Sequence, residues 1–417
     1  MTTIGALLGL ALAIVLIIKK LSPVYSLMFG ALVGALVGGL SLVETITVMT
    51  DGVKDVTPAV VRILAAGVLS GVLIKSGAAI TISNAIIRLM GERFTLAALA
   101  VTTLVLCGVG VFIDVAVITV APIALATGQR LKIPVPVLLM AMIGGGKCGN
   151  IISPNPNTII AAENLHAPLS MVMAANLIPA LIGLLFTVFV VLRFMPQRKA
   201  AFTPIELETT TEQQNLPSLL TSLVAPIVTI GLLALRPLLD IAIDPLIALP
   251  AGGIAGMLAM GQWRKLLPAV EFGLGKMAGV AVLLIGTGTI AGVIKNSGLK
   301  DCILSMLEHI HLGGVTIAPT AGALMSAATA STTAGATVAS ASFAETILAV
   351  GVPALWGAAM INAGATTLDH LPHGSFFHAT GGACELSFKQ RLRLVPYETA
   401  VGLVLTLASV ATYLLIG

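Results

Sequence analysis

The chain has 417 residues, of which 57% are hydrophobic and only 10% are charged. Soluble domains carry about 25% charged residues, so this composition, with a mean hydropathy of +1.05, excludes an ordinary soluble fold. Aromatic residues make up 4% and the net charge is +4, which provides neither the basic surface nor the stacking side chains of a nucleic-acid-binding protein. The scattered cysteines show no CxxC spacing, which argues against a disulfide framework or a metal site.

Apolar stretches long enough to cross a bilayer as helices recur along the whole chain. The first stretch ends at Lys19 and Lys20 and leads directly into the next, so we expect a first transmembrane helix and not a cleaved signal peptide. Candidate spans in the first half are Ile4–Ile18, Val24–Leu42, Pro58–Ile74, Thr95–Thr127, Pro134–Ile160 and Leu169–Leu192. Those in the second half are Leu219–Leu235, Ile241–Met260, Met277–Ile294, Thr316–Val350, Ala354–Gly382 and Ala400–Ile416.

The two halves resemble each other. The sequence SGVLIKSGA at 70–78 matches AGVIKNSGL at 291–299, and each is followed by a long stretch of small residues and then by a span that a polar, proline-containing motif interrupts. An internal repeat of this kind is typical of secondary transporters. We therefore expect a first repeat half with the N-terminal helices at 1–195, a cytoplasmic linker at 196–217, and a second, inverted half at 218–417.

The distribution of lysine and arginine predicts the membrane orientation. If Lys19 and Lys20 are cytoplasmic and the long stretches 95–127 and 316–350 are re-entrant hairpins, most basic residues fall on the cytoplasmic side, as the positive-inside rule requires. The same arrangement opens the two hairpins from opposite sides of the membrane. The predicted fold is thus an all-α polytopic membrane protein, an inverted repeat with two re-entrant hairpins and two broken transmembrane helices.

The two interrupted spans are the predicted binding site. Pro154 and Pro156 lie in the first break, SPNPNT, and DHLPHGSFF at 369–377 occupies the matching place in the second half. Proline removes a backbone donor, and non-helical backbone at membrane depth is tolerated where it is buried in protein or lines a wet cavity. The exposed half-helix N-termini suit an anion. The candidate substrate-binding residues are Lys147, Asn150, Ser153, Asn155, Asn157, Thr158, Ser331, Thr332, Thr333, His373, Gly374 and Ser375.

Ionisable groups at membrane depth are functional candidates by default. Lys147 is expected either to contact substrate or to form an ion pair with Asp114, and the two readings are equally supported. Asp114, Asp369, His370 and His373 are coupling candidates, because histidine titrates near neutral pH and can relay a proton. Each histidine could instead only donate a hydrogen bond to the broken backbone. A metal site at this second break has no zinc-like ligand spacing, so we expect no metal and no cofactor.

At these motifs the sequence resembles the gluconate permease (GntP) family of proton symporters, part of the ion-transporter superfamily. The resemblance rests on FIDVAVITVAPIALA at 112–126, SPNPNTIIAAENL at 153–165 and DHLPHGSFF, and it covers nearly the whole chain. It implies a homodimer in which a transport domain moves like an elevator against a scaffold, in the inner membrane. The chain departs from the family's proline-histidine-proline break by carrying Asn155, and it has Lys147 nearby.

The predicted function is secondary active transport of a small organic anion, such as gluconate, another sugar acid or a hydroxy acid, by proton symport. The alternative within the superfamily is a sodium-coupled di- or tricarboxylate carrier, whose ions would bind backbone carbonyls freed at the breaks. An intramembrane hydrolase would need a nucleophile and base on facing helices, and no such constellation is evident, so we do not expect an enzyme. A channel is a further alternative that currents too large for a carrier would reveal.

Overall fold

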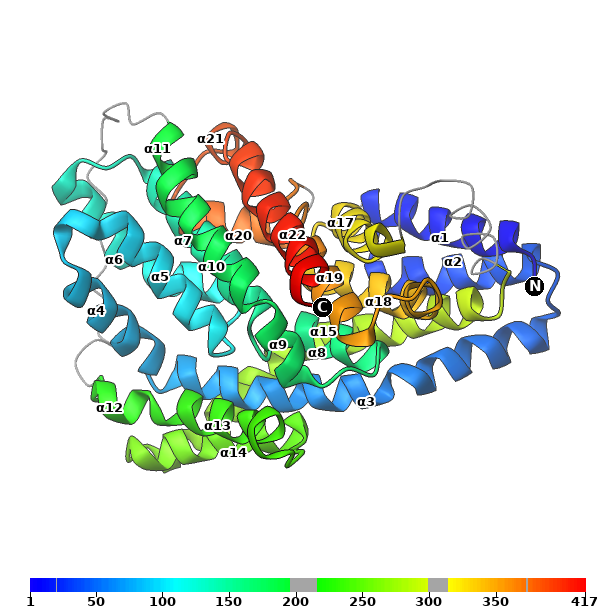
Figure 1. Ribbon diagram of the computed structural model, residues 1–417, viewed down its shortest axis with the longest axis horizontal. Helices are drawn as coiled ribbons and strands as arrows, with labels where there is room; N and C mark the ends of the chain where they lie inside the picture. The colour runs from blue at the N-terminus through cyan, green and yellow to red at the C-terminus, as the bar shows by residue number, and fades with distance from the viewer. Residues whose placement is uncertain (20, 196–215, 299–313, 373) are drawn as a thin grey trace.

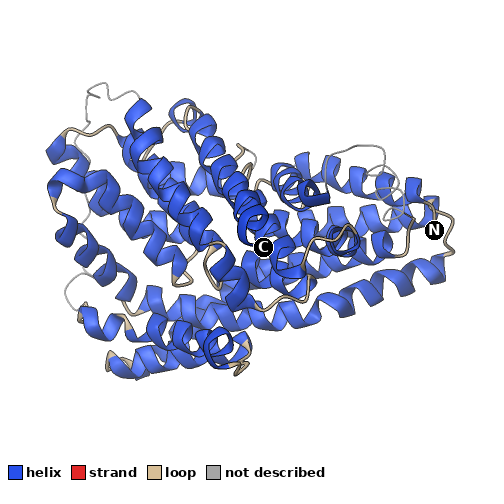
Figure 2. Cartoon of the chain, in the orientation of Figure 1, coloured by secondary structure: helices blue, strands red, loops and turns tan. Residues whose placement is uncertain are grey.

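The computed structural model describes residues 1–19, 21–195, 216–298, 314–372 and 374–417 (Figure 1). Within these ranges helices and short connections make up the chain, and no strand is present (Figure 2). The predicted linker at 196–217 lies outside the described residues except for its last two positions. The site candidate His373 also lies outside them.

The described helices fall into two groups along the chain, one before and one after the predicted linker. Before the linker they are α1 (Thr3–Ile18), α2 (Pro23–Val37), α3 (Leu42–Lys75), α4 (Ala78–Met90), α5 (Thr95–Gly108), α6 (Ile113–Leu131), α7 (Val135–Ile151), α8 (Pro156–Asn164), α9 (Leu169–Ala175), α10 (Leu177–Phe186) and α11 (Leu192–Phe194), with a π-helical turn at Thr187–Val191. After it they are α12 (Leu219–Ser222), α13 (Val224–Leu239), α14 (Pro245–Ala259), α15 (Leu266–Lys295), α17 (Ile317–Thr329), α18 (Thr332–Ala349), α19 (Ala354–Ala365), α20 (Ser375–Ala383), α21 (Phe388–Leu392) and α22 (Val395–Ile416).

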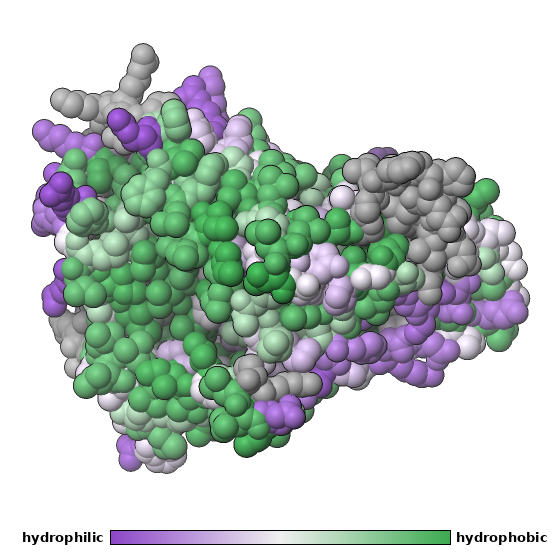
Figure 3. Space-filling model, viewed as in Figure 1, coloured by the Kyte–Doolittle hydropathy of each residue, from purple (hydrophilic) through white to green (hydrophobic). Residues whose placement is uncertain are grey.

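Six helical segments of the described chain are long and apolar enough to cross a membrane, and a seventh is added if α4 and α5, bent by 105° at their junction, count as one span. Apolar residues dominate the surface of the broad part of the molecule, with hydrophilic residues gathered at its rim (Figure 3). A soluble protein could not expose this much apolar surface. The prediction of an all-helical, polytopic membrane protein is confirmed.

The helix α3 is longer than the sequence predicts, since its 34 residues begin at Leu42 and not at Pro58. Ser41 and Glu44 form a capping box that starts the helix. The early turns carry exposed charges such as Lys54 and Asp51, which lower the local hydropathy. A prediction based on hydropathy therefore omits these turns. Pro58 lies inside the helix, where its missing donor interrupts one turn without ending it.

The long helices α3 and α15 pack against each other in opposite directions (Figure 1). Gly52, near the start of α3, lies against Gly288 and Gly292 in the second half of α15, whereas Gly71, near the end of α3, lies against Gly273. A Cβ atom added at Gly52 would lie 2.1 Å from the carbonyl oxygen of Gly288. Small residues let these two backbones approach closely, as is usual between transmembrane helices.

Both long small-residue stretches and both interrupted spans divide into two helices. The stretch 95–127 forms α5 and α6 around a break at 109–112, and 316–350 forms α17 and α18 around a left-handed residue, Ala330, with φ of 47°. The interrupted spans form α7 with α8 and α19 with α20. Helices α5 to α10 and α17 to α22 pack mainly among themselves, while α1 to α3 and α13 to α15 form a second group beside them.

Candidate functional site

The helix pairs formed at the four breaks converge on one cavity of about 360 Å³. The start of α6, the start of α8, the start of α18 and the start of α20 all reach it, and one wall comes from α15. It is lined by Phe112, Ile113, Asp114, Val115, Asn150, Asn157, Lys276, Gly279, Val280, Leu283, Ala330, Ser331, Thr332, Thr333, Asp369, Ser375 and Phe376. Sequence segments more than 200 residues apart therefore build one site.

Four helix N-termini at one cavity make it suited to an anion. Each helix start carries a partial positive charge of about half an elementary charge and unpaired backbone donors. The local sequence explains each start: Pro156 is the first residue of α8 behind the N-cap Asn155, and Ser331 caps α18 by accepting from the amide of Ala334 at 3.2 Å. Gly374 precedes α20 and packs on Ala330, where a Cβ would lie 2.3 Å from a carbonyl oxygen.

Lys147 is held at the second break. It is fully buried in α7, and its ammonium donates to the carbonyl of Thr366 and to the carboxylate of Asp369. Nδ1 of His370 lies 3.1 Å from the same ammonium. The pair with Asp114, one of the two alternatives that the sequence left open for Lys147, is not formed. The carboxylate of Asp369 and the carbonyl of Thr366, just after α19, bond the lysine instead. Lys147 does not line the cavity, so the structure places it behind Asp369.

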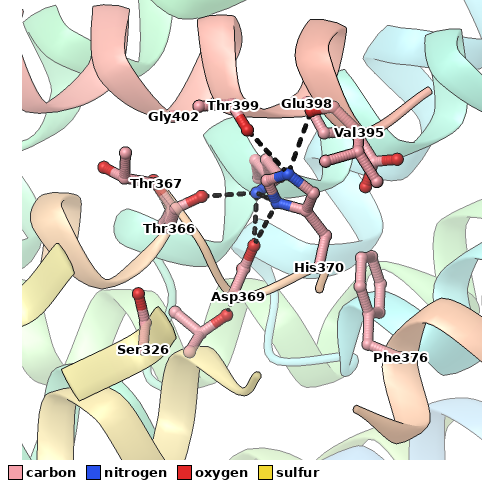
Figure 4. A network of polar contacts seen from close by, with 12 residues as sticks. Ser326, Thr366, Thr367, Asp369, His370, Phe376, Val395, Glu398, Thr399 and Gly402 are labelled. Atoms are coloured by element: carbon pink, nitrogen blue, oxygen red, sulfur yellow. Dashed lines mark hydrogen bonds and ion pairs between the residues drawn. The ribbon is translucent and has the colours of Figure 1, made fainter. Parts of the chain in front are cut away.

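His370 connects this ion pair to α22. Its Nε2 lies 3.1 Å from the carbonyl oxygen of Val395 and 3.0 Å from Oγ1 of Thr399, while Nδ1 lies 3.1 Å from Oδ1 of Asp369 (Figure 4). A carbonyl oxygen can only accept, so Nε2 carries a proton. Nδ1 has no hydrogen in this tautomer and can accept a hydrogen bond from the ammonium of Lys147.

Asp369 connects the ion pair to the cavity. Oδ1 accepts from Lys147, and Oδ2 accepts from the hydroxyl of Thr332 at 2.5 Å. Thr332 is the first residue of α18 and lines the cavity together with Asp369. A ligand that touches Thr332 is thus connected to the buried lysine through two hydrogen bonds, one from Thr332 to Asp369 and one from Lys147 to Asp369.

The first break is satisfied in a matching way by Asn362 of α19. Its amide donates to the carbonyl of Ile151 at 3.2 Å and to Oγ1 of Thr158 at 3.0 Å, and it accepts from Asn157 at 2.6 Å. Lys147 and Asn362 both lie one turn before the end of the helix that precedes a break, and each serves the break of the other half. The sequence analysis missed Asn362, an isolated amide within an apolar helix.

The remaining candidates fall into two sets. Residues that line the cavity, as a substrate-binding role requires, are Asp114, Asn150, Asn157, Ser331, Thr332, Thr333, Asp369 and Ser375. Asn155 and Thr158 are buried within the first break, where Asn155 caps α8 and the two side chains bond each other at 3.1 Å. The hydroxyl of Ser153 is buried without a hydrogen-bond partner in the described part of the chain. Neither these three residues nor Lys147 lines the cavity.

Lys276 lines the cavity, although the predicted spans left it in the connection between Met260 and Met277. The predicted span began at Met277, but α15 begins at Leu266, so Lys276 lies within the helix. The ammonium lies 5.6 Å from the centre of the Phe272 ring. The charge of Lys276, next to an apolar run, was interpreted as the boundary of a span although it lies inside α15.

Comparison with known proteins places the chain in a family. Residues 1–251 match the model of the GntP family permeases. The chain belongs to the GntP family. It is thus a transporter and not an enzyme, a multi-pass membrane protein that in bacteria lies in the inner membrane. Residues 221–311 also match the model of a Na⁺-H⁺ antiporter family.

The relatives agree with this assignment, and one solved structure shares the fold. An uncharacterized transporter of Haemophilus influenzae is 54% identical over 98% of this chain and 97% of its own. The high-affinity gluconate transporter of Escherichia coli K12 is 23% identical over 96% of both chains, and the D-serine transporter DsdX of the same strain is 23% identical over 54% of this chain and 55% of its own. The crystal structure of the Alcanivorax borkumensis YdaH transporter has the same fold, with a TM-score of 0.62, 16% identity and coverage of 90% and 89%.

Proposed function

We propose that the protein is a proton symporter of a small organic acid, such as gluconate, another sugar acid or a hydroxy acid. The observation that carries the proposal is the buried cluster of Lys147, Asp369 and His370, which reaches the cavity through Asp369. The full-length similarity to a gluconate transporter supports the substrate class.

The charges of the cluster give a reason for coupling. With Lys147 protonated, Asp369 ionised and His370 neutral, the cluster has no net charge. A further proton on His370 or on Asp369 leaves one uncompensated positive charge at a buried site, which is costly. An anion in the adjoining cavity offsets that charge, so proton and anion are each more stable in the presence of the other. This mutual stabilisation is the thermodynamic basis of symport.

We also propose an inverted repeat, with halves 1–195 and 218–417 on either side of the linker 196–217, and a homodimer that works by an elevator movement. The antiparallel packing of α3 and α15, which carry the matching motifs at their ends, supports the inversion. The two groups of helices, one holding the breaks and one holding α3 and α15, supply the two bodies that such a movement needs. In this scheme α5–α6 and α17–α18 are the re-entrant hairpins.

Sodium coupling is the second candidate. It is favoured by the match of 221–311 to an antiporter family and by the buried, unpartnered hydroxyl of Ser153 at the first break. A sodium site would use oxygen ligands, as hard cations do. Among sodium-coupled carriers the superfamily also offers di- and tricarboxylates as substrates.

Uptake into proteoliposomes tests the proposal. Labelled gluconate, other sugar acids, hydroxy acids, D-serine and dicarboxylates are offered separately under an imposed pH gradient and an imposed sodium gradient. The proposal expects uptake of a monocarboxylate driven by the pH gradient alone, and its loss in the variants Asp369→Asn and His370→Gln. Uptake that needs sodium at constant pH would replace it with the second candidate.

A further inference from the structure

The cavity contains one unpaired charge of each sign. Its charged lining residues are Asp114, Lys276 and Asp369. Both oxygens of Asp369 are occupied, Oδ1 by the ammonium of Lys147 and Oδ2 by the hydroxyl of Thr332. Neither Asp114 nor Lys276 forms an ion pair with any other residue in the ranges that the structure describes. Asp114 accepts only from the adjoining amide of Val115, at 2.9 Å.

Lys276 approaches the cavity from a different body of the molecule. It belongs to the α15 wall, together with Gly279, Val280 and Leu283, whereas the polar lining groups come from the breaks of the opposite helix group. Its ammonium lies 5.6 Å from the centre of the Phe272 ring, and the residue as a whole is exposed. A lysine side chain has a flexible four-carbon stem, so its charge can move from the ring toward a ligand in the cavity.

We propose that Lys276 binds the carboxylate of the substrate, and that Asp114 accepts hydrogen bonds from hydroxyl or ammonium groups at the substrate's other end. The site then selects small monocarboxylates that carry such donors. This inference rests on the proposed function, because it assumes that the cavity takes an organic acid.

The charge balance also predicts which acids are rejected. A second carboxylate on the ligand would face Asp114 and repel it, with no second free cation among the described lining residues to compensate. An uncharged polyol would leave Lys276 unpaired and lose the carboxylate interaction. Gluconate should therefore bind better than either the dicarboxylate glucarate or the polyol glucitol.

The test is gluconate uptake by purified variants in proteoliposomes. Replacing Lys276 by glutamine should raise KM for gluconate about tenfold, the effect of losing one charge-assisted hydrogen bond, and Lys276→Arg should restore most of the affinity. The matched control is Lys75→Gln. Lys75 also lies over the Phe272 ring, at 4.7 Å from its centre, but does not line the cavity. The control should change KM by less than about twofold.

A second variant tests selectivity. Asp114→Asn should make glucarate a better competitor of gluconate uptake, while glucitol remains a poor one. If Lys276→Gln and Lys75→Gln have equal KM values, or if Asp114→Asn leaves the competition by glucarate unchanged, the inference is overturned although the transporter works. Absence of gluconate, hydroxy-acid or amino-acid uptake by the unaltered protein would overturn the proposed function, and this inference with it.

Discussion

Removing one member of the buried Lys147–Asp369 pair should be far more damaging than removing both. Both side chains are shielded from water, at 0% and 3% exposure, and the helix pair that carries Asp369 is joined to α7 through them. Asp369→Asn preserves an oxygen for Thr332 but leaves the ammonium of Lys147 without its counter-charge. Breaking a buried pair in this way costs about 3–5 kcal/mol. The double variant, with Lys147→Met added, buries no unpaired charge and should recover much of that loss.

The assay is a double-mutant cycle on thermal unfolding in detergent. Unfolding is monitored by the reaction of a thiol reagent with the buried cysteines as they become exposed. The coupling free energy should exceed about 1 kcal/mol, whereas independent sites add within about 0.5 kcal/mol. The matched control is the exposed pair Lys54–Asp51, with side chains 76% and 55% exposed, for which we expect no measurable coupling. If the two single losses at Lys147 and Asp369 simply add, the ion pair does not join the two breaks and the reasoning is refuted.

Three further predictions follow from the packing and the surface charges. Gly273→Val should lower the unfolding temperature strongly, because its Cβ would lie 1.9 Å from a carbonyl oxygen of α3, while Gly275→Val on the same helix, with nothing within 4 Å, should not. Asn362→Leu should lower the free energy of unfolding by about 2–3 kcal/mol, because it leaves buried partners at the first break unsatisfied. A transport rate unchanged from the unaltered protein would contradict the role of Asn362 at this break. Arg62 holds the pKa of Asp244, in the loop before α14, below its ordinary value by hydrogen bonding. The contribution of Asp244 to the free energy of unfolding should therefore be present above about pH 4 and disappear as pH falls through the lowered pKa. Unfolding curves between pH 3 and 6 should show a steeper loss of stability for the unaltered protein than for Asp244→Asn.

The sequence predicted the breaks because proline and clustered polar residues are incompatible with a continuous apolar helix. Asn157 and Thr332, each near the start of a helix after a break, both line the cavity. The sequence could not predict which of the two breaks a buried polar side chain would hydrogen-bond. Lys147 was expected to contact either the substrate or Asp114, but it pairs with Asp369, 222 positions away. Only the packing of the two halves sets that partner.

Helix ends were predicted less well than breaks. Pro58 and Lys276 both suggested a boundary, yet each lies inside a long helix. A hydropathy pattern marks only the apolar part of a helix. The helices α3 and α15 extend beyond that part, where a cap and close glycine packing support them. Lys276 was missed as a site residue for this reason.

Proton movement with the substrate is the most direct test of the account. Proteoliposomes that hold a pH-sensitive dye are given external gluconate at equal pH and in the absence of sodium. Proton symport predicts internal acidification that accompanies uptake, saturates with gluconate, and disappears in the double variant Lys147→Met, Asp369→Asn. Uptake without acidification, or uptake that begins only when sodium is added, would contradict it.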